Sequence, residues 1–263
     1  MELNKIHNID CLQGLKMLED NSIDLVVTSP PYDDMRNYNG YSFDFENIAK
    51  ELYRVTKQGG VVVWVVGDKT KNGTESCTSF RQALYFRELG FNLHDTMIYD
   101  KNGAGGAKGS NYCYWQSFEY MFVFSKGKPK SINLICDREN KYATDKEHYA
   151  GKRNTDGSTT GRKIEKISKL GRRTNVWQIA NGFMKSTTDK IAYEHPAIFP
   201  EQLVNDHILS WSSEGDIVLD PFMGSGTTAK MAILNNRNYI GFELSTEYCE
   251  IANQRLSQIH KEK

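Results

Sequence analysis

A continuous run of β-branched and aromatic residues, Val61-Val62-Val63-Trp64-Val65-Val66, constrains the fold of this 263-residue chain more than any other feature. A strand with one solvated face alternates apolar and polar residues, whereas a strand buried on both faces has no need to. Helical patterns at 45–55 and 78–89 flank the run, so helices are available to cover a sheet. The sequence therefore predicts an α/β fold with a mostly parallel sheet.

Shorter apolar runs predict further strands, and apolar residues at helical spacing predict helices near both ends of the chain. The strands are expected at 5–9, 23–27, 92–99, 120–124, 216–219 and 239–242, and the helices at 11–18, 227–234 and 246–259. A hydrophobic content of 39% suits one large core, or one core with an appended lobe.

The chain shows no sign of membrane insertion or export. No stretch approaches 18 uninterrupted apolar residues, and no apolar signal region follows the first residues. We therefore expect a cytoplasmic protein that does not contact membranes. No two cysteines have Cys-x-x-Cys spacing, so we expect reduced thiols that pack in the fold and no structural zinc site. The five are Cys11, Cys77, Cys113, Cys136 and Cys249.

The segment Ser29-Pro30-Pro31-Tyr32 follows the predicted strand at 23–27, where the chain must leave the sheet. Consecutive prolines stiffen this exit and lack backbone donors, so carbonyl oxygens near Ser29 and Pro30 can accept hydrogen bonds from an amino group. Tyr32 offers a flat face on which a base can stack, and the Ser29 hydroxyl adds a polar contact. An amino group held in this way could attack a sulfonium methyl group without a metal. Taken alone, Pro-Pro-Tyr is more typical of a turn or a peptide-like ligand motif than of a catalytic segment.

Residues 216–243 have the order strand, glycine-rich turn, helix, strand and acid. Gly224 and Gly226 permit a tight turn and a close backbone approach to a ligand. Glu243 ends the second strand, where a carboxylate can accept both ribose hydroxyls of an adenosine cofactor; a surface acid is the alternative. Ala229 stands at the third glycine position of the dinucleotide fingerprint, which leaves pyrophosphate binding open. Because ligands of open α/β sheets bind at the carboxyl ends of strands, both segments are expected to face one crevice.

Positive charge concentrates in one segment of the chain. Residues 126–173 carry fourteen Lys and Arg against six Asp and Glu, which leaves +8 there and −8 elsewhere in a chain of zero net charge. Such a segment is typical of a polyanion site, because neutralised phosphates release condensed counterions. A solvated Lys/Arg-rich insertion is the alternative. Segment 126–190 lacks apolar periodicity apart from Val176-Trp177, which predicts an inserted lobe or long loops outside the core.

Together the motifs resemble those of S-adenosylmethionine-dependent DNA amino-methyltransferases of the β arrangement. In that family a Ser/Asp/Asn-Pro-Pro-aromatic motif precedes a Phe-x-Gly-x-Gly motif, and a target-recognition region lies between them. Ser29-Pro30-Pro31-Tyr32 matches the first motif, and Phe222-Met223-Gly224-Ser225-Gly226 matches the second. The segment 195–203 resembles the helix-entry motif that the family places against the cofactor.

The resemblance implies a Rossmann-like, circularly permuted methyltransferase fold that acts on a base flipped out of the duplex. It implies a catalytic half at 1–125, a target-recognition insert at 126–190 and a cofactor-binding half at 191–263. Asp10 could serve the cofactor, cap the following helix, or do both; His195 could be a helix-entry residue without ligand contact. The implied catalytic residues are Ser29, Pro30, Pro31 and Tyr32, and the implied S-adenosylmethionine-binding residues are Asp10, Phe199, Asp220, Phe222, Gly224, Ser225, Gly226, Thr227 and Glu243.

Several functions stay open from the sequence. The Ser-first form of the motif resembles cytosine-N4 enzymes more often than adenine-N6 enzymes, so we predict cytosine N4, with adenine N6 as the alternative. A nicotinamide or flavin oxidoreductase would explain the glycine turn and Glu243 but not Ser29-Pro30-Pro31-Tyr32. A nucleic-acid-binding protein without chemistry would explain only the basic segment.

The predicted partner is double-stranded DNA. The small size of the insert leaves two arrangements open, a short target site or a homodimer that shares the reading of the DNA. The resemblance also leaves open a cognate restriction nuclease.

Overall fold

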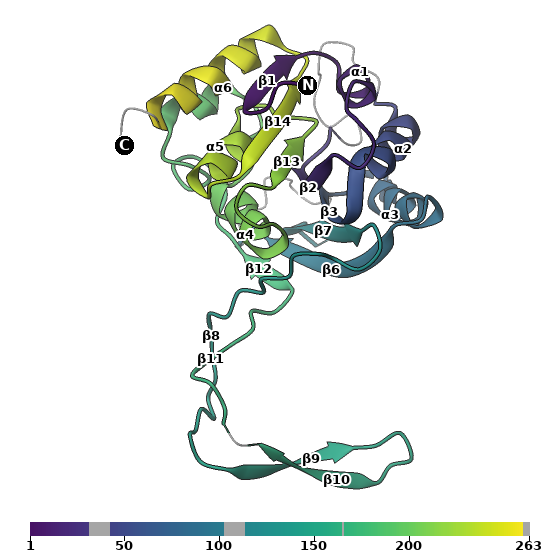
Figure 1. Ribbon diagram of the computed structural model, residues 1–263, viewed down its shortest axis with the longest axis vertical. Helices are drawn as coiled ribbons and strands as arrows, with labels where there is room; N and C mark the ends of the chain where they lie inside the picture. The colour runs from purple at the N-terminus through teal and green to yellow at the C-terminus, as the bar shows by residue number, and fades with distance from the viewer. Residues whose placement is uncertain (32–42, 103–113, 165, 260–263) are drawn as a thin grey trace. The chain divides into compact units, whose positions relative to one another are not determined.

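The computed structural model describes residues 1–31, 43–102, 114–164 and 166–259 (Figure 1). Their contacts divide the chain into two compact units. The first unit consists of Met1–Asn133 and Asn175–Lys263, and the second of Leu134–Thr174. Among the described residues, no helix combines the length and apolarity that crossing a bilayer requires.

The first unit is built on an eight-stranded sheet whose strands are parallel except for β7, which runs antiparallel to both neighbours. The predicted mostly parallel α/β fold is therefore confirmed. In spatial order the strands are β1 (Lys5–Asn8), β14 (Asn238–Glu243), β13 (Ile217–Asp220), β2 (Ile23–Thr28), β3 (Thr56–Val66), β7 (Phe118–Ser125), β6 (Asn92–Asp100) and β12 (Val176–Gln178).

Helices cover both faces of this sheet (Figure 1). One face carries α1 (Cys11–Lys16), α2 (Phe45–Val55) and α3 (Thr78–Glu88). The other carries α4 (Glu201–Trp211), α5 (Thr227–Leu234) and α6 (Thr246–Ile259), and a short 3₁₀ helix, η1 (Lys190–Glu194), precedes α4.

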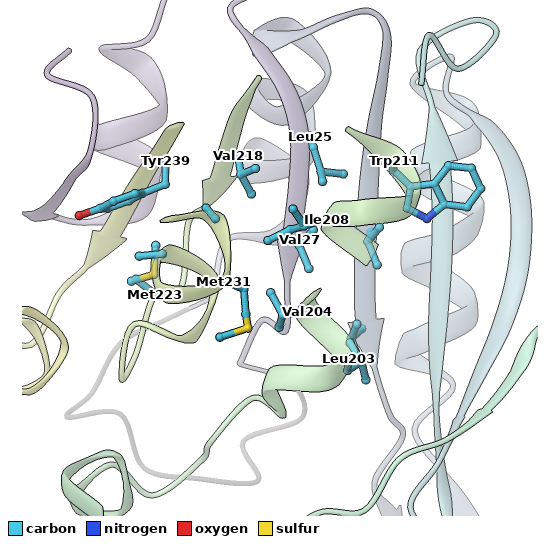
Figure 2. Close-up of a cluster of buried hydrophobic side chains, with 14 of the residues drawn as sticks. Leu25, Val27, Leu203, Val204, Ile208, Trp211, Val218, Met223, Met231 and Tyr239 are labelled. Atoms are coloured by element: carbon cyan, nitrogen blue, oxygen red, sulfur yellow. The ribbon is translucent and has the colours of Figure 1, made fainter. Parts of the chain in front are cut away.

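Alternate residues of each central strand enter two separate cores. Val61, Val63 and Val65 of β3 pack in the core beneath α4, α5 and α6, whereas Val62, Trp64 and Val66 pack beneath α1, α2 and α3. Figure 2 shows the first core, where Leu25 and Val27 of β2 lie between Val218 and the side chains of α4. This double burial explains why the strands read as continuous apolar runs.

Local signals set the helix boundaries. The Asp10 carboxylate accepts a 3.1 Å hydrogen bond from the Gln13 N–H, so the predicted cap of α1 is confirmed. Asp44 caps α2 in the same way. The largest boundary difference is in β3, which begins at Thr56 and not at Val61, because Thr56 already pairs with Ile23 of β2.

The predicted insert contains both a separate unit and one strand of the main sheet. The second unit holds two antiparallel ribbons, β8 (Arg138–Glu139) with β11 (Leu170–Gly171), and β9 (His148–Arg153) with β10 (Thr159–Ile164). Beyond it, Val176–Gln178 pairs with β6, and Trp177 is buried. The expectation that this stretch lies outside the core is wrong at Trp177 and Ile179, because two buried side chains in and just after a three-residue strand form too short a pattern to distinguish from a loop. A further small ribbon joins β4 (Thr70–Lys71) to β5 (Thr74–Glu75).

Candidate functional site

The two sequence motifs meet at one edge of the sheet. Strands β2 and β13 are parallel neighbours, with Leu25 opposite Val218 and Val26 opposite Leu219, so they end side by side. A cleft of about 1030 Å³ lies over these ends. The expectation of a shared crevice is confirmed. Residues of both motifs line it: Ser29, Pro30, Pro31, Asp220, Phe222, Gly224, Ser225 and Thr227.

Asp220 connects the two strand ends. One of its carboxylate oxygens accepts from the Thr28 hydroxyl at 2.6 Å and from the Phe222 N–H at 3.0 Å, and the other accepts from the Thr228 hydroxyl at 2.6 Å. Burial raises the pKa of Asp220 to about 6, although these hydrogen bonds oppose the shift. The side chain therefore fixes the Ser29-Pro30-Pro31 exit against the glycine turn, and each of its oxygens accepts a hydrogen bond from the protein.

Glu243 holds the glycine turn from the neighbouring strand. Its carboxylate accepts from the Gly224 N–H at 2.8 Å and from the Ser245 N–H at 2.9 Å, one bond to each oxygen. Burial raises the pKa of Glu243, while the backbone donors of Ser245 and Gly224 lower it. A carboxylate oxygen has two lone pairs, so each oxygen keeps one for a ligand in the cleft.

The two glycines of the turn serve different needs. Gly224 has φ +51°, and a Cβ there would lie 3.1 Å from the His195 ring. Gly226 has φ +82°, and a Cβ there would lie 2.9 Å from the Cβ of Ala252 on α6. Gly226 is not among the cleft-lining residues, so its position reflects helix packing and not ligand approach.

The remaining predicted residues distribute as follows. Asp10 and Phe199 line the cleft, at the start of α1 and just before α4. His195 also lines it, and its ring meets that of Tyr248 edge to face at 4.3 Å. Tyr32 lies outside the described residues.

A buried ion-pair network beneath the glycine turn escaped the sequence analysis. The Arg255 guanidinium on α6 is fully buried and donates to the Ser225 carbonyl at 3.1 Å and to the Thr227 hydroxyl at 2.9 Å. It also pairs with Asp189 and Glu201, which Lys230 bridges at 2.7 Å to each. Charge pairing lowers the pKa of Asp189 despite its burial. The network therefore ties the turn to α4, α5 and α6.

Comparison with known proteins finds a matching family and similar relatives that are all named as methylases or methyltransferases. Residues 23–254 match the family model described as DNA methylase. The chain is 64% identical over 247 residues to the orphan methyltransferase M.BamHII of Bacillus amyloliquefaciens, and the aligned region covers 92% of each chain. It is 32% identical over 263 residues to the Type II methyltransferase M.BglII of Bacillus subtilis, across 97% of this chain and 69% of that one.

Solved structures share the fold. The PvuII DNA methyltransferase, described as cytosine-N4-specific, superposes with a TM-score of 0.67 at 20% identity and covers 95% of this chain and 85% of its own. The M1.HpyAVI complex with SAM superposes with a TM-score of 0.63 at 22% identity, covering 96% and 98%.

Proposed function

The chain belongs to the N6/N4 DNA methylase family, and from this premise we propose that it transfers the methyl group of S-adenosylmethionine to the N4 amino group of a cytosine flipped out of duplex DNA. The coarser activity, DNA methylation of the N4/N6 amino class, follows from family membership. The oxidoreductase and binding-only alternatives are not retained, because neither accounts for the family match.

One observation carries the proposal: the Ser29-Pro30-Pro31 exit and the glycine turn line a single cleft and are joined through Asp220. A catalyst for methyl transfer must hold its two reactants in contact, and this arrangement gives each a place beside the other. The cleft is also large enough for a nucleoside cofactor together with a base, since ligand pockets generally range from about 300 to 1,000 Å³.

Residues of the cleft fit the cofactor. When bound, S-adenosylmethionine supplies an electrophilic methyl group carried on a sulfonium. The free lone pairs of Glu243 suit ribose hydroxyls. Gly224 has no side chain, so the space beside the His195 ring, which a Cβ would fill, stays open. We assign Asp10, Phe199 and Phe222 to the adenosine end. Asp220, Ser225, Gly226 and Thr227 would support the turn from below, through Thr28, Arg255 and Ala252.

The Ser29-Pro30-Pro31 exit would hold the amino group. Proline has no N–H, so the carbonyl oxygens of this segment meet no competing donor from the two prolines themselves. Acceptors on the amino hydrogens would direct the nitrogen lone pair toward the methyl group, and the proton that the methylated nitrogen loses would pass to water. We assign Tyr32 to stacking on the flipped base, which would offset part of the cost of unstacking it.

The second unit would bind the duplex. Its β9–β10 ribbon exposes Lys152, Arg153, Arg162 and Lys163, and a two-stranded ribbon is narrow enough for the major groove of B-DNA. We therefore propose that the insert at 126–190 carries target recognition, between the catalytic half and the cofactor half.

Nucleoside mass spectrometry of DNA methylated by the purified protein tests the proposal. N4-methylcytosine as the product supports it. N6-methyladenine as the only product would contradict the cytosine assignment and support adenine, the other target base of the family. Ser29 at the first motif position would then not indicate a cytosine target. Sequencing of modified bases in a host that expresses the chain would then map the target site.

A further inference from the structure

Strand order divides the cleft into two ends. Strand β2, with Ser29 after it, lies between β13, β14 and β1 on one side and β3, β7 and β6 on the other. The adenosine-end residues and the glycine turn follow the first set, apart from Phe199 just before α4. If the cofactor occupies that end, the base that meets it at Ser29 must extend over the second set. This end of the cleft is lined by Asp68, Tyr99, Lys101, Gln116, Phe118 and Glu119.

The charged groups at this end are already satisfied within the protein. The Lys101 ammonium and the Glu119 carboxylate pair at 2.5 Å, with 19% and 15% of their side chains exposed. Asp68 accepts from the Ser79 N–H and the Ser76 hydroxyl, each at 3.0 Å, which anchors the start of α3. Lys101 and Glu119 form one neutral ion pair, and Asp68 adds a carboxylate bound to neutral donors, so this wall is polar and holds more acid than base.

The Tyr99 hydroxyl is different. Across the part of the chain that the structure describes, it is the one buried side-chain nitrogen or oxygen without a hydrogen-bond partner. Tyr99 is 3% exposed and lies between Glu119 of β7 and Trp177 of β12 in the sheet. A buried hydroxyl without a partner is costly, because it has given up its bonds to water. Phenylalanine would fill the same space without that cost. The presence of the hydroxyl therefore indicates that it bonds to a ligand in the cleft.

The Tyr99 hydroxyl also keeps its proton and can therefore donate. Burial raises the pKa of Tyr99 well above its usual range, and the neighbouring carboxylates of Glu119 and Asp100 act in the same direction. A neutral phenol at physiological pH offers one O–H to an acceptor.

We propose that the Tyr99 hydroxyl donates a hydrogen bond to the ring acceptor beside the amino group of the flipped base. Cytosine and adenine carry an unprotonated ring nitrogen next to the amino group, whereas thymine and guanine carry an N–H beside a carbonyl. A donor at this place therefore favours cytosine and adenine over thymine and guanine. This inference rests on the proposed function.

The test is methylation by Tyr99→Phe of a duplex that contains the mapped site. We expect kcat/KM to fall about tenfold, the effect of one lost hydrogen bond in a desolvated site. Affinity for S-adenosylmethionine, measured by calorimetry, should not change. The Tm should stay equal or rise, because the variant removes an unpaired buried hydroxyl.

A second duplex separates base contact from a structural role. With an abasic site at the target position, wild type and Tyr99→Phe should bind equally, because no base receives the bond. Tyr239→Phe is the matched control, since Tyr239 is a buried strand tyrosine that does not line the cleft, and its kcat/KM should match wild type.

Each other outcome is decisive. An unchanged kcat/KM in Tyr99→Phe overturns the assignment. A lower Tm together with an equal loss of binding affinity for the intact and abasic duplexes also overturns it. A wild-type chain that methylates no DNA instead refutes the proposed function itself.

Discussion

The hydroxyl of Thr28, the last residue of β2, donates a 2.6 Å hydrogen bond to the carboxylate of Asp220, the last residue of β13. These two residues are 192 positions apart in the sequence, yet they set the spacing between the Ser29-Pro30-Pro31 exit and the glycine turn. The bond is buried, so its geometry is protected from competition by water. Changes to this pair should therefore affect stability and chemistry together.

Asp220 should make stability fall as pH rises. Its folded pKa of about 6 exceeds the ordinary value of 3.8, so the folded state binds the proton more tightly. This contribution is complete below pH 3.8 and is lost as pH rises through 6. Relative to Asp220→Asn, which does not titrate, wild type should lose about 3 kcal/mol of unfolding free energy between about pH 3.5 and 7. Urea denaturation across that range measures the difference, and a pH-independent difference would contradict it.

Arg255 should be essential to the fold. Arg255→Met leaves Asp189 and Glu201 with Lys230 alone and should lower the free energy of unfolding by about 3–5 kcal/mol. Arg255→Lys keeps the charge without the forked donor geometry, so its free energy of unfolding should lie between those of wild type and Arg255→Met. The control is Lys166→Met, whose pair with Asp145 is largely exposed and should matter by less than about 1 kcal/mol. Equal urea midpoints for the Arg255→Met and Lys166→Met variants would argue against the network.

The sequence was sufficient to predict the two motifs of the site, but it could not predict the Arg255 network. Strand exits and glycine turns are continuous segments whose residues act together, so their order predicted the shared cleft. Arg255 sits in an ordinary helical pattern, and its partners come from the segment before α4, from α4 itself and from the glycine turn. Nothing local marks it as buried. The β9–β10 ribbon was missed for a related reason: it has no apolar face, so it shows no alternation to detect.

Gly226→Ala should destabilise more than Gly215→Ala, although both residues have φ +82°. Gly215 has open space where a Cβ would lie, so its alanine carries only the left-handed backbone penalty of about 1–2 kcal/mol. At Gly226 the new methyl group also meets Ala252, which should add about 1–3 kcal/mol. Thermal unfolding of both variants measures the gap, and equal losses would exclude the steric term.

Glu243→Gln should weaken S-adenosylmethionine binding by roughly 10- to 100-fold, the effect of losing charge-assisted hydrogen bonds. The amide cannot accept from both Gly224 and Ser245 and still present two acceptors to the ribose. Calorimetry measures the Kd. Glu247→Gln is the control, because Glu247 is exposed on α6, and matching Kd values for the two variants would refute the role of Glu243.

The ribbon of the second unit should govern the salt dependence of DNA binding. Lys152 and Arg162 share one face of the ribbon, because Thr160 lies opposite the first and Ala150 opposite the second. The double variant Lys152→Gln/Arg162→Gln should reduce the slope of log Kobs against log salt by about 1.8, or about 0.9 for each lost phosphate contact. Fluorescence anisotropy on a duplex measures it. Lys50→Gln, exposed on α2 in the first unit, should leave the slope unchanged; an unaltered slope in the double variant would remove the ribbon from the interface.

Among the strands that the structure describes, β1 pairs with β14 alone, and Lys5 lies opposite Ile240. On the ribosome, β1 is therefore made more than two hundred residues before β14, its partner in the sheet. At about 5–20 residues per second, this delay is on the order of tens of seconds. The Ser29-Pro30-Pro31 exit is made more than two hundred residues before Glu243 and Arg255. A nascent chain consequently cannot bring the two motifs and the Arg255 network together until α6 has been synthesised.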